Sequence, residues 1–143
     1  MTKVVVAGNF FVLHDGHINH LEEARKLGDY LIAIIGSDDY LMAKGKKIFL
    51  SLENRKKQLM AWADEVVEVI DKDGTCAETL RMLSPDIFAK SKDRTFNNMP
   101  QKELEVCKEI GCRIVYGVGN KYLGLSSSEV AKSLEGTNDK LAG

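Results

Sequence analysis

Short runs of β-branched and other apolar residues alternate five times with longer segments in which apolar residues recur at helical spacing. A parallel strand can follow another only after a crossover long enough to hold a helix, so this order is typical of a parallel sheet covered by helices. The strands are predicted at residues 3–7, 30–35, 66–70, 86–89 and 113–118. The fold class that this pattern predicts is α/β.

Helices are predicted after each strand, at residues 16–27, 51–62, 75–83, 100–110 and 126–134. Their ends carry residues that are typical of helix termini. Ser51 and Thr75 can cap an N-terminus, and Pro100 suits a first helical turn. Gly28 and Gly111 stand where a C-cap is expected.

Composition limits the class of protein and its surroundings. The 143 residues are 44% hydrophobic and 29% charged with only 2 prolines, which excludes a disordered or fibrous chain. A net charge of -1 gives no argument for binding nucleic acid or an anionic membrane, and no apolar stretch approaches the ~20 residues of a membrane helix. The first residues show no signal-peptide pattern. We therefore expect one cytoplasmic domain over residues 1–143, with a tail that frays over 136–143.

Disulfide and metal chemistry find little support in the sequence. The three cysteines are odd in number and lack the spacing of a zinc or redox motif, so we interpret Cys76, Cys107 and Cys112 as reduced thiols. The three histidines stand at three-residue intervals, which could bring two imidazoles onto one helix face. No carboxylate or cysteine completes a ligand set, so no metal site is predicted, and His20 is expected to pack or to point to solvent.

A parallel sheet binds ligands at the carboxyl ends of its strands, where the loops 8–16, 36–50, 90–100 and 119–128 should meet. The first loop carries His14, Asp15, Gly16 and His17, and His17 falls in the opening turn of the next helix. Imidazoles there can donate hydrogen bonds to phosphate oxygens, and the helix dipole favours an anion. The loop predicts an anion site, with two surface histidines at a helix start as the alternative.

Basic residues follow the second strand. Three lysines, among them Lys44 and Lys46, surround a glycine, which suits a polyphosphate, with solvated surface lysines as the alternative. Arg55, one turn into the next helix, could bring a guanidinium to the same edge. The alternative for Arg55 is an exposed helical arginine paired with Glu53 or Asp64.

The loop after the fifth strand ends in Ser126, Ser127 and Ser128, followed by Glu129. Helix capping needs only one of these hydroxyls. The surplus, together with three glycines upstream, predicts a second phosphate cradle at a helix start.

Three motifs in order carry a resemblance to a known family. The segment GNFFVLHDGHINHLEEARKLGDYLIAIIGSD, the later LENR and the LSSSEV near the end resemble the cytidylyltransferase-like nucleotidyltransferases, from about residue 4 to 134. This resemblance implies a Rossmann-like, doubly wound sheet of five parallel strands in the order 3-2-1-4-5, with helices on both faces. It is nearest to the branch of glycerol-3-phosphate cytidylyltransferase and the heptose-phosphate adenylyltransferases of lipopolysaccharide core biosynthesis.

The resemblance also implies roles for individual residues. His14 and His17 would contact the nucleoside triphosphate and stabilise the α-phosphate as it is attacked, and Lys44 and Lys46 would approach the phosphates. Arg55 would bind the acceptor or support the site. The implied nucleotide-binding positions are Gly8, Asn9, Phe10, Gly16, Asp93, Ser126, Ser127 and Ser128.

Two of these serines, Ser127 and Ser128, would hold the β- and γ-phosphates, and Asp93 would lie near the nucleotide or the acceptor. Mg²⁺ is implied as a cofactor, bound mainly through the nucleotide itself. Oligomerisation, most simply a homodimer, is implied as well. The chain departs from the family pattern in two loops. In the first loop, Phe11 replaces the usual aspartate and Asn9 replaces a small residue; in the fourth, Ser91 and Lys92 replace the usual glycines before Asp93.

The resulting hypothesis is an enzyme that transfers AMP or CMP from ATP or CTP to a small phosphorylated acceptor, such as a sugar phosphate or glycerol phosphate, and releases pyrophosphate. A phosphate acceptor is already an oxyanion and needs no strong base, which fits loops rich in histidine and lysine. One alternative is an adenylyltransferase acting on FMN. Another is a non-catalytic nucleotide-binding regulatory protein. A dehydrogenase is disfavoured because no GxGxxG follows the first strand.

Overall fold

The computed structural model describes residues 1–8, 15–37, 51–91 and 96–119. In this part of the chain five strands form one sheet, in the order β3-β2-β1-β4-β5, and every neighbouring pair is parallel. The strands are β1 (Lys3–Gly8), β2 (Tyr30–Ile35), β3 (Glu65–Glu68), β4 (Ile87–Ala89) and β5 (Arg113–Val115). The predicted fold class, parallel sheet and strand order are confirmed.

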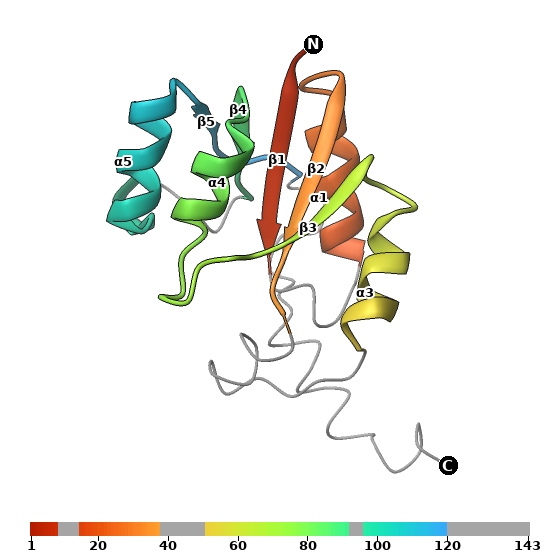
Figure 1. The fold of residues 1–143 in the computed structure, drawn as a ribbon. Coiled ribbons are helices and arrows are strands. Elements are labelled where there is room, and N and C mark those ends of the chain that lie inside the picture. The colour runs from red at the N-terminus through yellow and green to blue at the C-terminus, as the bar shows by residue number, and fades with distance from the viewer. Residues whose placement is uncertain (9–14, 38–50, 92–95, 120–143) are drawn as a thin grey trace.

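The helices pack on both faces of this sheet (Figure 1). They are α1 (Asp15–Arg25), α3 (Leu52–Leu59), α4 (Ala77–Leu83) and α5 (Gln101–Ile110), with a 3-10 turn η1 (Phe96–Asn98) before α5. Side chains of α1 and α3 join one apolar cluster, and those of α4 and α5 join the other. None of the helices in these ranges is long and apolar enough to cross a membrane.

The central strand β1 supplies both clusters because side chains alternate along a strand. Val4 and Val6 face the α1 and α3 side, whereas Val5 faces the α4 and α5 side, and none of the three is more than 1% exposed. The β-branched run therefore forms a strand that is buried on both faces, as expected for the middle of a doubly wound sheet.

Two helix ends agree with the sequence prediction, and a third lies one residue from it. Ser51 caps α3, and its Oγ accepts a hydrogen bond from the Asn54 amide at 3.3 Å. Pro100 directly precedes α5, and Gly111 ends that helix with a left-handed φ of 73°. The predicted helix 126–134 and the predicted tail 136–143 lie outside the described residues.

Gly28 does not have the predicted role of a C-cap. Helix α1 ends at Arg25, and Gly28 is not among the glycines with positive φ. A Cβ atom at Gly28 would lie 2.7 Å from both the Thr2 carbonyl oxygen and the Val4 Cγ2 atom. A glycine stands here because the chain passes close to the start of β1 on its way into β2.

Strand β5 is shorter than predicted. It ends at Val115, not at residue 118, because Gly117 and Gly119 take positive φ values of 72° and 76° and turn the chain. Val118 lies between these glycines and is still buried in the cluster that faces α1. The sequence predicted a longer strand because Val118 is apolar and buried, although it makes no strand pairing in β5.

Candidate functional site

The carboxyl ends of the strands lie at one edge of the sheet (Figure 1). Gly8 ends β1, is exposed, and pairs in register with Ile35, the last residue of β2. Ala89 and Val115, which end β4 and β5, also pair with each other. Because α1 follows β1 in a parallel crossover, its N-terminus is directed to this same edge, as the loops predicted.

His17 lies in the first turn of α1, as predicted. The helix starts at Asp15 with Gly16 as its second residue, and the His17 side chain is half-buried with its Nδ1 atom shielded from solvent. The first amide groups of a helix have no acceptor within the helix, and the helix dipole is positive at that end. The start of α1 therefore combines an imidazole with outward amide hydrogens, a combination that favours an anion.

Arg55 is buried under the same edge of the sheet. Its side chain is 1% exposed, and Nη1 donates a hydrogen bond of 2.6 Å to the carbonyl oxygen of Gly36, the residue that follows β2. The alternative of an exposed ion pair with Asp64 is wrong, because Asp64 accepts two hydrogen bonds of 2.9 Å from the Arg25 guanidinium. Arg55 thus brings a fixed cation to the end of β2.

Lys90 joins the ends of β4 and β5. Its backbone N–H donates to the Val115 carbonyl at 2.8 Å, and its carbonyl accepts from the Val118 N–H at 3.0 Å. The ammonium group lies 4.6 Å from the centre of the Phe88 ring. Sequence reasoning did not include Lys90 among the site residues, although its place directly after a strand, at the ligand edge, is a usable signal.

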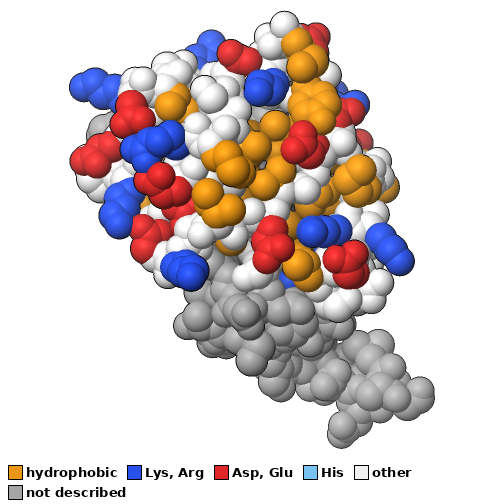
Figure 2. Space-filling model, in the orientation of Figure 1, with side chains coloured by type: hydrophobic (Ala, Val, Ile, Leu, Met, Phe, Trp, Pro, Cys, Tyr) orange, Lys and Arg blue, Asp and Glu red, His pale blue; other side chains and the backbone are white. Residues whose placement is uncertain are grey.

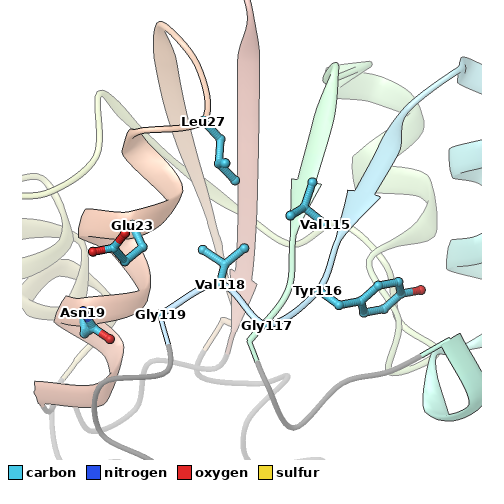
Figure 3. Close-up of a pocket in the computed structure, with 8 residues that line it drawn as sticks. All are labelled: Asn19, Glu23, Leu27, Val115, Tyr116, Gly117, Val118 and Gly119. Carbon is cyan, nitrogen blue, oxygen red and sulfur yellow. The ribbon is translucent and has the colours of Figure 1, made fainter.

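A cavity of about 350 Å³ lies between α1 and the segment that follows β5. Figure 3 shows Asn19 and Glu23 of α1, and Leu27 just after that helix, on one side and residues 115–119 on the other, with the Tyr116 ring directed away from α1. The cavity extends along α1 from Asn19 to Leu27, just beyond the helix. The part of the cavity near Leu27 is therefore remote from the carboxyl ends of the strands.

His20 is one of the residues that pack, as the sequence allowed. The side chain is 8% exposed, and Nδ1 lies 2.7 Å from the Val118 carbonyl oxygen. Within the described ranges no group of three or more His, Cys, Asp or Glu side chains is placed to hold a metal ion. The three cysteines are buried free thiols, as predicted.

The structure thus brings Gly8, the start of α1 with Gly16 and His17, and Arg55 to one edge of the sheet. The other site residues predicted from the sequence lie outside the described residues; they are Asn9, Phe10, His14, Lys44, Lys46, Asp93, Ser126, Ser127 and Ser128.

Fold and motif together define a class of enzyme, the nucleotidyltransferases. The chain belongs to the cytidylyltransferase-like family, whose model matches residues 5–133. A FAD synthase from Picrophilus torridus is 33% identical over 137 residues, which cover 92% of this chain and 95% of that protein. A glycerol-3-phosphate cytidylyltransferase from Bacillus subtilis is 45% identical over 69 residues, which cover 47% of this chain and 54% of that protein.

A solved structure agrees with this assignment. The lipopolysaccharide core biosynthesis protein from Thermoplasma volcanium superimposes with a TM-score of 0.68 at 27% identity, over 81% of this chain and 95% of that chain. The shared fold therefore extends over most of both chains.

Proposed function

We propose that this enzyme transfers AMP or CMP from ATP or CTP to a small phosphorylated acceptor, a sugar phosphate or glycerol phosphate, and releases pyrophosphate. The observation that carries the proposal is the place of His17, in the first turn of the helix that follows the central strand of a cytidylyltransferase-like sheet. An imidazole at a helix N-terminus is suited to a phosphate under attack.

The proposed reaction requires mainly that the two substrates are aligned and that the charge of the phosphates is stabilised. An oxygen of the acceptor phosphate attacks the α-phosphorus, a new P–O bond forms, and the bond to the β-phosphate breaks with its electron pair leaving on pyrophosphate. The attacking oxygen is already anionic, so no strong base is needed, and catalysis rests on in-line alignment and on stabilising the charge of the transition state. In this proposal His17 donates a hydrogen bond to the α-phosphate.

The remaining roles follow the family resemblance. His14, Lys44 and Lys46 would contact phosphates, and Ser127 and Ser128 would hold the β- and γ-phosphates. Mg²⁺ would enter with the triphosphate, held mainly by the nucleotide, and would neutralise phosphate charge. Arg55 supports the site by fixing the end of β2 through Gly36.

Replacing His17 tests the proposal. His17→Ala should lower kcat by about a hundredfold or more, since one lost donor to transition-state charge costs that much, while the circular dichroism spectrum is retained. The measurement is the initial rate of pyrophosphate release. Glu22→Gln is the matched control, because Glu22 is exposed on the same helix. A His17→Ala variant with the wild-type rate would contradict the proposed role.

A second candidate acceptor is FMN, which would make the product FAD. The similarity to the Picrophilus torridus FAD synthase favours it, because that match extends over 92% of this chain. Pyrophosphate release with ATP and with CTP, against glycerol phosphate, sugar phosphates and FMN, separates the two candidates. Binding of ATP or CTP, seen as thermal stabilisation, without turnover on any acceptor would instead support a nucleotide-binding regulatory protein.

A homodimer is part of the proposal, and one face of the molecule supports it. Figure 2 shows apolar side chains gathered on the face between α4 and β3. Ile70 and Met82 are 51% and 56% exposed, and Ile70 is tied to α4 by a 3.0 Å hydrogen bond from its N–H to Thr79 Oγ1. Exposed apolar patches of this kind are common at protein interfaces.

Mass measurement in solution tests the dimer. Ile70→Asp should convert a dimer into a monomer in sedimentation equilibrium, because a charge would be buried in the interface. Met60→Asp is the matched control, since Met60 is 52% exposed at the end of α3, on the other face. A monomeric wild-type protein, or the same effect from both variants, would contradict this interface.

A further inference from the structure

The segment that follows β5 is tied to α1 at one buried point. His20 lies one turn beyond His17, and its Nδ1 atom is 2.7 Å from the carbonyl oxygen of Val118. Both residues are less than a tenth exposed. A carbonyl oxygen only accepts hydrogen bonds, so Nδ1 carries a proton and donates it across a sequence separation of 98 residues.

The backbone of Gly119 also packs closely against the backbone of His20, beside this hydrogen bond. A Cβ atom at Gly119 would lie 2.5 Å from the Cα atom and 2.8 Å from the backbone nitrogen of His20. On its other side, Val118 donates its N–H to the Lys90 carbonyl, which follows β4. Figure 3 shows Gly119 directly beside α1. Residues 117–119 are therefore held between α1 and the end of β4.

We propose that His20 is a positioning residue for nucleotidyl transfer. Its Nδ1–H fixes the exit of β5 relative to α1, and hence relative to His17, which lies three residues earlier on the same helix. This inference rests on the proposed function. In-line transfer depends on alignment, and a displacement of about 1 Å can cost on the order of a hundredfold in rate, so a hydrogen bond remote from the chemistry can act on kcat.

A pair of substitutions separates this role from simple packing. His20→Leu keeps much of the side-chain volume and removes the donor. His20→Asn loses the ring but keeps an N–H group bonded to Cγ, the position that Nδ1 occupies in histidine. If His20 only fills the core, activity should follow thermal stability, and the leucine variant should be at least as active as the asparagine variant.

Positioning predicts the opposite order of activity. With both substrates saturating, His20→Leu should lower kcat by about tenfold or more while the KM values change much less. His20→Asn should recover most of that loss even if its melting temperature is the lower of the two. Assays are run well below both melting temperatures, with Glu22→Gln as the control on the exposed side of α1.

Hydrogen exchange gives a readout that does not depend on turnover. The amides of residues 117–119 should exchange faster in His20→Leu than in His20→Asn, because only asparagine can still hold the Val118 carbonyl. A folded His20→Leu variant with wild-type kcat would overturn the inference, as would equal protection of these amides in both variants.

Failure of the proposed function would give a different result, namely a wild-type protein that turns over no acceptor. If the leucine variant does not fold, Gly119→Ala strains the same contact with His20 intact and should lower kcat.

Discussion

Arg55 is the bulkiest side chain that is fully buried in the part of the chain that the structure describes. Burying a charge is unfavourable unless the group is hydrogen-bonded, and the carbonyl of Gly36 is one partner that its guanidinium has. The sequence offered Glu53 and Asp64 as partners by spacing alone. It could not show that Asp64 belongs to Arg25, since α1 and the residues before β3 meet only in the folded chain.

Removing the two arginine charges should have unequal effects. Arg55→Met should lower the free energy of unfolding by about 2–3 kcal/mol, because it leaves a buried carbonyl without its charged donor. Arg25→Met should lower it by about 1 kcal/mol or less, since that ion pair is half exposed. Urea unfolding at neutral pH measures both. Equal decreases in the free energy of unfolding would show that the burial of Arg55 makes no difference to its contribution to stability.

At the scale of elements, the start of α4 is capped by a residue other than the one predicted. The carboxylate of Asp71 accepts hydrogen bonds from the Glu78 and Thr79 amides at 2.8 and 3.0 Å and from the Thr79 hydroxyl at 2.7 Å. Thr75, the predicted cap, accepts only a longer bond of 3.3 Å from the Ala77 amide. The bend at residues 72–75 brings Asp71 back to the start of the helix, which a local capping pattern does not reveal.

The two candidate caps can be compared directly. Asp71→Ala should lower the free energy of unfolding by about 1–2 kcal/mol, at the upper end of helix-cap effects, because three donors lose one acceptor. Thr75→Ala should cost less than half as much. Thermal or urea unfolding of the two variants gives the comparison. A larger loss from Thr75→Ala would restore the prediction made from sequence.

Elements were predicted well where a pattern is long and local. The alternation of strands and helices, the strand β1 and the cap of α3 all follow from spacing or from one adjacent residue. The end of β5 was not predicted, because Val118 satisfies an apolar pattern while packing outside the ladder. Apolar character predicts that a residue is buried, but it does not predict where the pairing of β5 with β4 ends. That point is set by two glycines with positive φ.

For the molecule as a whole, one carboxylate joins three elements. Asp64 accepts from the Arg25 guanidinium of α1 and, at 2.9 Å, from the Leu31 amide of β2, and it directly precedes β3. The hydrogen bonds from Arg25, then the Leu31 amide, and to a smaller extent the charge of Arg25 hold the pKa of Asp64 below its usual value. The free energy of unfolding is thereby linked to pH.

The sign of this linkage gives a prediction. A free aspartate titrates near about pH 3.9, and folding favours the ionised Asp64, so its contribution is present above that pH and is lost as pH falls through the lower folded value. Asp64→Asn should therefore be less stable than wild type at about pH 6, by about 1 kcal/mol or less, and the gap should close towards about pH 3. Urea unfolding across this range measures it. A gap that is constant with pH would contradict the assignment.

The location of the candidate site could be predicted from sequence because topology alone brings the carboxyl ends of parallel strands together. His17 in the first turn of α1 followed from the position of the motif after a strand. The contact between His20 and Val118 could not be predicted, since it joins residues 98 positions apart and leaves no local pattern. Long-range polar contacts are set by packing that a single sequence does not display.

The distribution of sulfur in the core has an experimental consequence. All three cysteines belong to the apolar cluster under α4 and α5, and burial raises the pKa of the Cys76 thiol, which keeps it protonated. Cys107 and Cys112 also line a surface pocket, whereas Cys76 lies at the start of α4, so we expect an alkylating reagent to reach Cys76 when that layer separates from the sheet. The rate of Cys76 labelling under native conditions therefore measures how often the layer of α4 and α5 opens. It gives no information about α1 and α3, which cover the opposite face.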